Sequence, residues 1–248
     1  MIRIRGLKHT YPGGAEALKG VDLDVARGEF LLLCGPNGSG KSTLIRHINA
    51  LLEPFGGTVE VNGMESRRHA RDVRALVGMV FQDADSQIIG ETVWEDTAFG
   101  PENMGLSADE IDGRVREALE ATGILELADR PCYALSGGEK RRLALAGVLA
   151  MRPEVLIFDE PFVNLDYRGV RAFLTQLLRL HQAGHTILLT THDVEKVAPL
   201  ADRVALLTDG VIHWSGPPSE MVPRLRECGV RPPCYALLGG EPISWLDD

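Results

Sequence analysis

The chain has 248 residues and a formal net charge of -9 at neutral pH, which suits one large domain with an ample core. This acidic balance gives no basic surface of the kind that binds nucleic acid, so we expect no nucleic-acid partner. Four cysteines without metal-ligand spacing or a dense disulfide framework are typical of the reducing cytosol. The sequence has neither a signal-peptide core nor an apolar run of the ~20 residues that a membrane helix needs. We therefore expect any membrane role to be peripheral.

The N-terminal segments Ile2–Tyr11 and Leu18–Val25 alternate apolar and polar residues, as half-buried strands do. The sequence YPGG between them is typical of a turn. Together they predict an N-terminal antiparallel β-layer.

Continuous apolar runs predict a second, parallel sheet. Phe30–Cys34, Val155–Phe158 and Thr186–Thr190 have the composition of strands buried on both faces. These runs alternate with helical segments, so the fold class is α/β, with right-handed βαβ units and ligands bound at the carboxyl edge of the sheet. Cys34 is expected to be a small core residue at a strand end.

The sequence GPNGSGKS directly follows the first of these runs and matches the phosphate-loop pattern. Its glycines let backbone N–H groups point at phosphates, Lys41 reaches the β- and γ-phosphates, and Ser42 offers a hydroxyl to Mg²⁺. A helix from Lys41 to about Leu52 should follow. We therefore expect ATP and Mg²⁺ as cofactors. The expected nucleotide-binding residues of this loop are Gly35, Pro36, Asn37, Gly38, Ser39, Gly40, Lys41, Ser42 and Thr43.

Two carboxylates, Asp159 and Glu160, end the run that begins at Val155, at the same expected edge of the sheet. Asp159 suits a metal-binding aspartate, and Glu160 suits a general base, a role typically worth about 10²–10⁴ in rate. An acidic helix cap is the alternative, but a cap alone does not explain a tandem pair.

Between residues 83 and 151 the pattern changes to that of a small inserted helical subdomain. The sequence SADE predicts a capping box between Ser107 and Glu110. One apolar helical face follows it, made of Ile111, Val115, Ala118, Leu119 and Thr122. The main domain is expected to span residues 1–216. Six prolines limit the C-terminal extension, residues 217–248, to short helices.

The sequence LSGGE raises the question of a second phosphate site. Ser136 and Glu139 predict a capping box for a helix that runs to Met151 and stops before Pro153. A cap requires neither Gly137 nor Gly138, and each glycine costs roughly 0.5–1 kcal/mol near a helix start. Close approach of the backbone to an anion would justify that cost, whereas a well-capped helix is the simpler alternative.

Five motifs occur in an order that resembles the nucleotide-binding subunit of ATP-binding cassette (ABC) transporters, over Met1 to about Gly216. They are GPNGSGKS, VFQD, LSGGE, VLIFDE and TTHD. The resemblance implies the phosphate-loop ATPase fold of that family and ATP hydrolysis. It also implies that Ser136, Gly137, Gly138 and Glu139 close over the ATP of an opposite subunit, which is either a second copy or a paralogue.

The resemblance also assigns roles to single residues. Gln82, at the end of an expected strand Leu76–Phe81, would reach the metal or the attacking water, and His192 would donate to the γ-phosphate. Tyr11 would stack on adenine, although a surface tyrosine beside a turn is the alternative. Asp166, in the sequence NLD, would belong to the nucleotide-binding loop that follows the catalytic glutamate.

The segment after Gln82 resembles the energy-coupling factor branch, which imports metal ions such as cobalt or nickel, or vitamins. The matching residues are Asp85, Gln87, Ile88, Ile89, Trp94, Phe99, Gly100 and Pro101, while Ala84 stands where the branch has a proline. Ile88, Ile89 and Trp94 are expected to form an exposed apolar patch that receives an integral membrane subunit. The alternative is an amphipathic helix packed within the subdomain.

The function implied is an ATPase subunit of an importer, at the cytoplasmic face of the cell membrane. A non-transport ABC ATPase acting on nucleic acid or ribosomes is the alternative. Such proteins carry two cassettes in one chain or a long coiled coil between phosphate loop and signature, and this chain has neither.

Overall fold

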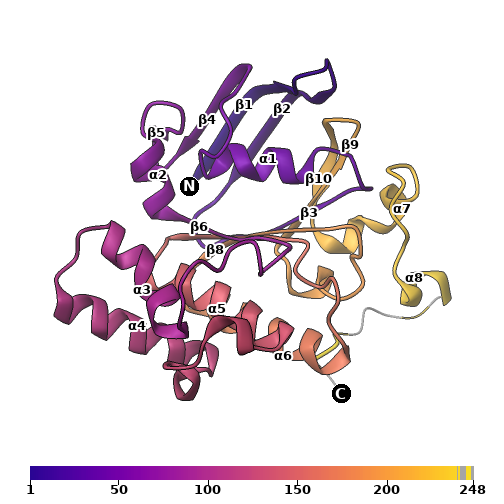
Figure 1. The fold of residues 1–248 in the computed structure, drawn as a ribbon. Coiled ribbons are helices and arrows are strands. Elements are labelled where there is room, and N and C mark those ends of the chain that lie inside the picture. The colour runs from indigo at the N-terminus through magenta and orange to yellow at the C-terminus, as the bar shows by residue number, and fades with distance from the viewer. Residues whose placement is uncertain (239, 241–243, 247–248) are drawn as a thin grey trace.

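In the computed structural model, which describes residues 1–238, 240 and 244–246, the strands form two sheets (Figure 1). The antiparallel sheet has the order β2-β1-β4-β5. Its strands are β1 (Ile2–Thr10), β2 (Glu16–Val25), β4 (Gly56–Val61) and β5 (Met64–Glu65). The alternation of β1 and β2 buries one face of this sheet, which confirms the expected N-terminal β-layer.

The second sheet has the order β10-β9-β3-β8-β7-β6, and all its pairings are parallel except the one between β10 and β9. Its strands are β3 (Phe30–Cys34), β6 (Val77–Val80), β7 (Val155–Asp159), β8 (Thr186–Thr191), β9 (Arg203–Thr208) and β10 (Val211–Gly216). Every residue of β3, β7 and β8 is buried, as their continuous apolar runs predict. Cys34 is fully buried at the end of β3, also as expected.

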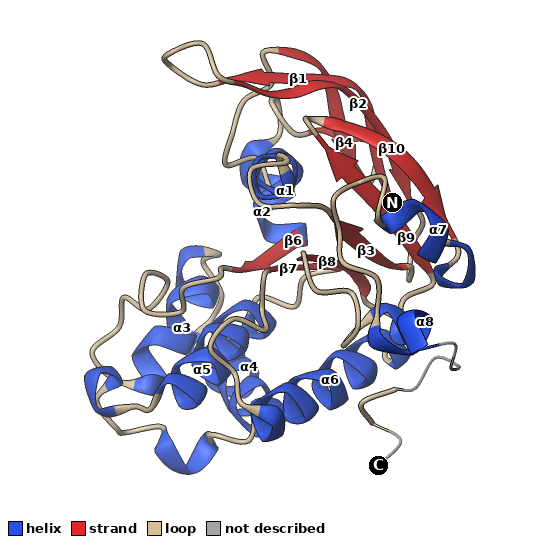
Figure 2. Cartoon of the chain, turned by 90° about the vertical axis from the view of Figure 1, so that its right-hand side faces the viewer, coloured by secondary structure: helices blue, strands red, loops and turns tan. Residues whose placement is uncertain are grey.

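Helix α1 (Lys41–Ile48) lies between the two sheets and shares one apolar core with both of them (Figure 2). The expected extension to Leu52 is wrong, because Asn49 caps the helix and Ala50 adopts a positive φ of 57°. Leu76 is also not part of a strand: it ends α2 (Ala70–Leu76), and β6 begins one residue later.

The inserted subdomain consists mainly of α3 (Val93–Asn103), α4 (Ala108–Thr122) and α5 (Gly137–Ala150). Both expected capping boxes are present, at Ser107 and at Ser136. Helix α5 has two buried sides: Ala144, Leu145 and Val148 pack on the core under the parallel sheet, while other residues pack within the helical subdomain. This one helix therefore joins the subdomain to the main core.

Helix α6 (Tyr167–Gln182) covers the face of the parallel sheet opposite α1 (Figure 2). The C-terminal extension contains the short helices α7 (Val222–Leu225) and α8 (Cys234–Leu238), as the prolines predict. Met221 and Leu225 are fully buried in the core under the sheet, so this part of the extension packs as part of the main domain. None of the helices described is long and apolar enough to span a bilayer.

Candidate nucleotide site

The phosphate loop joins β3 to α1 and is packed too tightly for side chains at two of its glycines. A Cβ atom on Gly35 would lie 2.0 Å from the carbonyl oxygen of Leu207, and one on Gly40 would lie 2.6 Å from that of Ala17. Gly40 also has a φ of 103°, which only glycine adopts readily. The neighbouring strands therefore fix the loop as a backbone cradle at the start of α1.

Lys41 is the buried cation of this loop, with 6% of its surface exposed. Its Nζ donates hydrogen bonds to the carbonyl oxygens of Gly35 at 2.8 Å and Pro36 at 3.1 Å. The same Nζ lies 3.4 Å from Oε1 of Glu160. The lysine thus spans the loop and one of the two carboxylates at the sheet edge.

Asp159 holds the hydroxyl groups of two other elements. Its Oδ1 accepts hydrogen bonds from Ser42 Oγ at 3.1 Å and from Thr190 Oγ1 at 2.7 Å. The carboxyl ends of β7 and β8 and the start of α1 therefore meet at one point, as expected of a parallel sheet. Carboxylate, hydroxyl and amide oxygens are ligands that Mg²⁺ accepts, so Asp159, Ser42 and Gln82 suit a magnesium ion.

Glu160 is held in an unusual backbone conformation, with a φ of 47°. Its N–H lies 3.1 Å from both the carbonyl and the hydroxyl oxygen of Thr190. Its Oε2 lies 3.0 Å from Nδ1 of the half-exposed His192, whereas its buried Oε1 makes no hydrogen bond. The structure thus brings Glu160, His192 and Lys41 together, and leaves one glutamate oxygen with bonding capacity to spare.

Sequence reasoning missed Thr190, which is fully buried and bonds both acidic residues. The signal was the pair of threonines that ends an otherwise apolar strand, TILLTT. A buried hydroxyl needs a hydrogen-bond partner, and in a parallel sheet the neighbouring strand end supplies it. Thr190 therefore fixes the positions from which Asp159 and Glu160 act.

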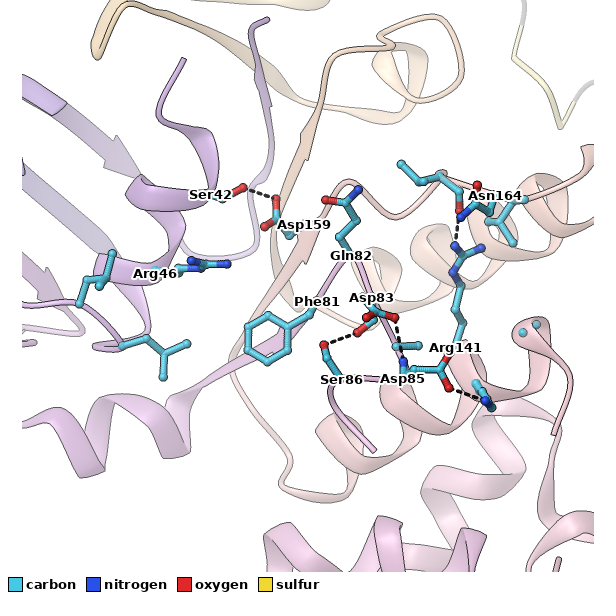
Figure 3. A pocket seen from close by; sticks show the side chains of 18 residues that line it. Ser42, Arg46, Phe81, Gln82, Asp83, Asp85, Ser86, Arg141, Asp159 and Asn164 are labelled. Atoms are coloured by element: carbon cyan, nitrogen blue, oxygen red, sulfur yellow. Dashed lines mark hydrogen bonds and ion pairs between the residues drawn. The ribbon is translucent and has the colours of Figure 1, made fainter. Parts of the chain in front are cut away.

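A cavity of about 990 Å³ opens beside Ser42 and Asp159, whereas Lys41 and Glu160 are not among the residues that line it. In Figure 3, Ser42 and Asp159 lie on one side and Arg141 of α5 on the other, with Gln82 between them. Gln82 is exposed just beyond β6, so its amide is available to a ligand in this space. The two signature glycines, Gly137 and Gly138, line the same cavity.

Tyr11 lies beside the first turn of α1, next to the phosphate loop. Its hydroxyl is 3.1 Å from Thr43 Oγ1, and its ring meets that of His9 edge to face with centroids 4.6 Å apart. The ring of His9 is in turn 4.8 Å from that of His47. This packing fixes Tyr11 next to the phosphate loop, where stacking on adenine stays a prediction.

The signature stretch is ordered without any packing requirement for its glycines. Hydrogen bonding from the Ser136 side chain, together with the Ser136 backbone N–H that donates to Glu139 Oε2 at 2.6 Å, lowers the pKa of Glu139 below its usual value. A Cβ atom on Gly137 or Gly138 would meet nothing within 4 Å. The folded chain by itself therefore gives no steric reason for either glycine.

Asp166 has a role within its own chain, because it caps α6 by accepting a hydrogen bond from the N–H of Gly169 at 2.7 Å. Its expected contact with nucleotide stays a prediction. Between Glu160 and Asp166, Asn164 adopts a φ of 59°, so the loop holds two residues in the left-handed region.

The expected apolar patch is wrong in part. Ile89 is 60% exposed, but Ile88 and Trp94 pack against the core of the helical subdomain. Gln87 also turns inward: it accepts from the N–H of Phe81 and donates to the carbonyl of Met79. The exposed partner of Ile89 is Phe99, and both line a groove of about 750 Å³.

Comparison with known proteins gives one family. Residues 18–163, more than half of the chain, match the ABC transporter family. The cobalt import ATP-binding protein CbiO of Rhodobacter capsulatus is 47% identical, covering 94% of this chain and 85% of the relative. The energy-coupling factor transporter ATP-binding protein EcfA of Methanocaldococcus jannaschii is 42% identical, and the match covers 99% of this chain and 92% of the relative.

Two solved structures have the same fold. CbiO1 of Clostridium perfringens, described as part of the ABC transporter complex cbiONQ, superimposes with a TM-score of 0.82 at 38% identity and covers 96% of this chain and 98% of its own. The dimeric structure of the ATP-binding cassette MJ0796 bound to ADP and Pi superimposes with a TM-score of 0.78 at 29% identity. The match covers 88% of this chain and 98% of that chain.

The fold, together with the two carboxylates at the sheet edge beside the phosphate loop, defines an ABC ATPase. The chain belongs to the ABC transporter family. Members of this family bind ATP and couple its hydrolysis to transport, so the chain is an ATPase. The expected class, fold and activity are thereby confirmed.

Proposed function

We propose that this chain is the ATP-hydrolysing subunit of an energy-coupling factor importer, bound to the cytoplasmic face of the membrane, and that its cargo is a metal ion such as cobalt or nickel, or a vitamin. The observation that carries this proposal is the contact network at the sheet edge, in which Asp159 bonds Ser42 and Glu160 pairs with Lys41. The names of the relatives support the branch and the class of cargo.

In this proposal each group has a separate task. Lys41, now bonded to its own loop, exchanges those carbonyl oxygens for phosphate oxygens. Ser42, Asp159 and Gln82 hold Mg²⁺, which would supply positive charge against the phosphates. Glu160 accepts the proton of the attacking water through Oε1, which makes no hydrogen bond to the described residues and is released from its pairing with Lys41 when the lysine turns to the phosphates. His192 holds the other oxygen and so orients the carboxylate.

The same proposal pairs the chain head to tail with a second ATPase subunit, either another copy or a paralogue. Gly137 and Gly138 then present backbone N–H groups at the start of α5 to the phosphate of the opposite ATP. The absence of any contact at their Cβ positions leaves this approach open. The integral membrane subunit docks in the groove that contains Ile89 and Phe99.

The test is hydrolysis of ATP by the purified chain and by Glu160→Gln. We expect the variant to keep ATP affinity within about twofold and to lose at least about 100-fold in turnover, because the amide cannot take a proton. Glu117→Gln, which alters an exposed ion pair with Arg152 on the helical subdomain, is the matched control and should keep the wild-type rate. Near-wild-type phosphate release by Glu160→Gln would remove the glutamate from the mechanism.

A further inference from the structure

One contact joins the helical subdomain to the loop that carries Glu160. Arg141 of α5 donates a hydrogen bond from its Nη2 to the carbonyl oxygen of Val163, between β7 and α6 (Figure 3). Its side chain lines both the cavity of about 990 Å³ and a second one of about 390 Å³ between α5 and α6. Arg141 therefore crosses the boundary between the two parts of the molecule.

The loop that receives this bond needs support. Glu160 and Asn164 carry side chains, yet both have positive φ angles, of 47° and 59°. Such conformations persist only where the surroundings hold them. Thr190 holds the start of the loop and the Asp166 cap holds its end, while the turn bonds inside it are long, at 3.4 and 3.3 Å. Arg141 supplies the side-chain anchor for the middle.

The position of Arg141 costs free energy, because its charged guanidinium is partly removed from water. It is partly buried, and this burial lowers the pKa of its guanidinium. Within the described part of the chain Arg141 forms no ion pair with a carboxylate. The carbonyl oxygen of Val163 is the hydrogen-bond acceptor of its guanidinium. A buried arginine is usually paired, which makes this backbone contact the evident reason for the residue at this site.

We propose that Arg141 is a positioning residue for hydrolysis: it ties the loop that carries Glu160 to α5, so that the position of the helical subdomain sets the position of the base. The same helix begins with the signature glycines and, at Gly147, lines the proposed docking groove. A shift of α5 on docking or pairing therefore moves Val163 and, through it, Glu160. This inference rests on the role proposed for Glu160.

The test compares Arg141→Met, which keeps the length of the side chain and removes its donors, with Arg141→Lys, which keeps one donor. We expect kcat to fall about tenfold in the methionine variant and about threefold in the lysine variant, with KM for ATP and nucleotide affinity within twofold of wild type. Arg179→Ala alters an exposed arginine of the same cavity and should stay within twofold of wild type in both constants. Arg141→Gln, too short to reach Val163, replaces the methionine variant should that one fail to fold.

A double-mutant cycle separates positioning from simple structural support. Asn164→Gly removes the strain at a φ of 59°, so the loop needs Arg141 less. We expect Arg141→Met to lower kcat about tenfold in the wild-type background and less than threefold in the Asn164→Gly background. Equal losses in the two backgrounds, or an Arg141→Met variant with wild-type kcat, would overturn the inference. If Glu160→Gln keeps its turnover, the proposed function fails instead, whatever the arginine variants show.

Discussion

The phosphate loop and the start of α5 are both built around glycines, but their surroundings differ. At Gly35 and Gly40 an added Cβ would collide with neighbouring strands, whereas at Gly137 and Gly138 it would meet nothing within 4 Å. Packing within one chain therefore explains the first pair and leaves the second unexplained.

The side chains repeat this contrast. Lys41 is buried and bonded to its own loop, while Glu160 Oε1 lies 3.4 Å from Lys41 Nζ and Oε2 lies 3.0 Å from His192 Nδ1. The signature residues cap their own helix, and Glu139 also pairs with Arg130 of the same subdomain. The phosphate-loop half of the site thus has its contacts within a single chain. The signature half instead leaves the backbone of Gly137 and Gly138 open to a ligand or a second subunit. This contrast is the physical argument for the proposed pairing of two subunits.

The largest expected effect comes from breaking each half in turn. Lys41→Ala removes the phosphate cation, and Gly138→Val blocks backbone approach to an anion, so each variant alone should lose at least about 100-fold in turnover. Because a Cβ atom at this position would meet nothing within 4 Å, Gly138→Val should still fold and bind ATP. Steady-state ATPase rates and nucleotide titrations measure the two effects.

Mixing the two variants then tests the pairing. In a mixed dimer, one site combines an intact phosphate loop with an intact signature, so random pairing should restore roughly a quarter of the wild-type rate. Mixed dimers are isolated with two affinity tags, and each variant is paired with a paralogue in the same way if the natural partner is one. No recovery in verified mixed dimers would show that the signature acts on the nucleotide of its own chain.

A smaller effect is expected at the proposed docking groove, which lies between α2 and the helices α3 and α5. Ile89→Asp with Phe99→Asp places two charges on exposed apolar sites, so recovery with the membrane subunit should fall at least about tenfold. ATP affinity should stay within twofold, because neither residue lines the nucleotide cavity. Leu238→Asp, at an exposed residue of α8, is the control. Parallel loss of ATP affinity would mean that the groove residues support the fold.

The outcome at this groove shows what the sequence could and could not predict. The strands and the phosphate loop were predictable because buried parallel strands and glycine turns have local signatures. Ile88 and Trp94 are expected in an exposed patch but lie half-buried against the subdomain core, since an apolar helical face looks alike whether it packs or docks. The bonds of Thr190 and Arg141 join residues far apart in the chain, which no local pattern records.

The smallest expected effect is on the pH dependence of stability. The phosphate-loop half has a buried histidine in the helix that follows the loop, whereas the signature half has no histidine. His47 of α1 is fully buried, its Nδ1 lies 3.0 Å from the carbonyl oxygen of Leu52, and its Nε2 has no partner. Burial, with a smaller contribution from the charge of His9, lowers the pKa of His47 from 6.5 to about 4. The folded chain therefore keeps this imidazole neutral at pH values where the unfolded chain protonates it.

Between pH 6.5 and about 4 the unfolded chain binds one more proton at this histidine than the folded chain does. The free energy of unfolding should accordingly fall as the pH falls through this window, with no contribution from His47 above it. Urea unfolding at pH 7.5 and pH 5 should show a loss larger by about 1–2 kcal/mol in the wild type than in His47→Gln. His213→Gln, at an exposed histidine of β10, should keep the wild-type difference. Equal losses in wild type and His47→Gln would show that His47 already carries its proton in the folded chain.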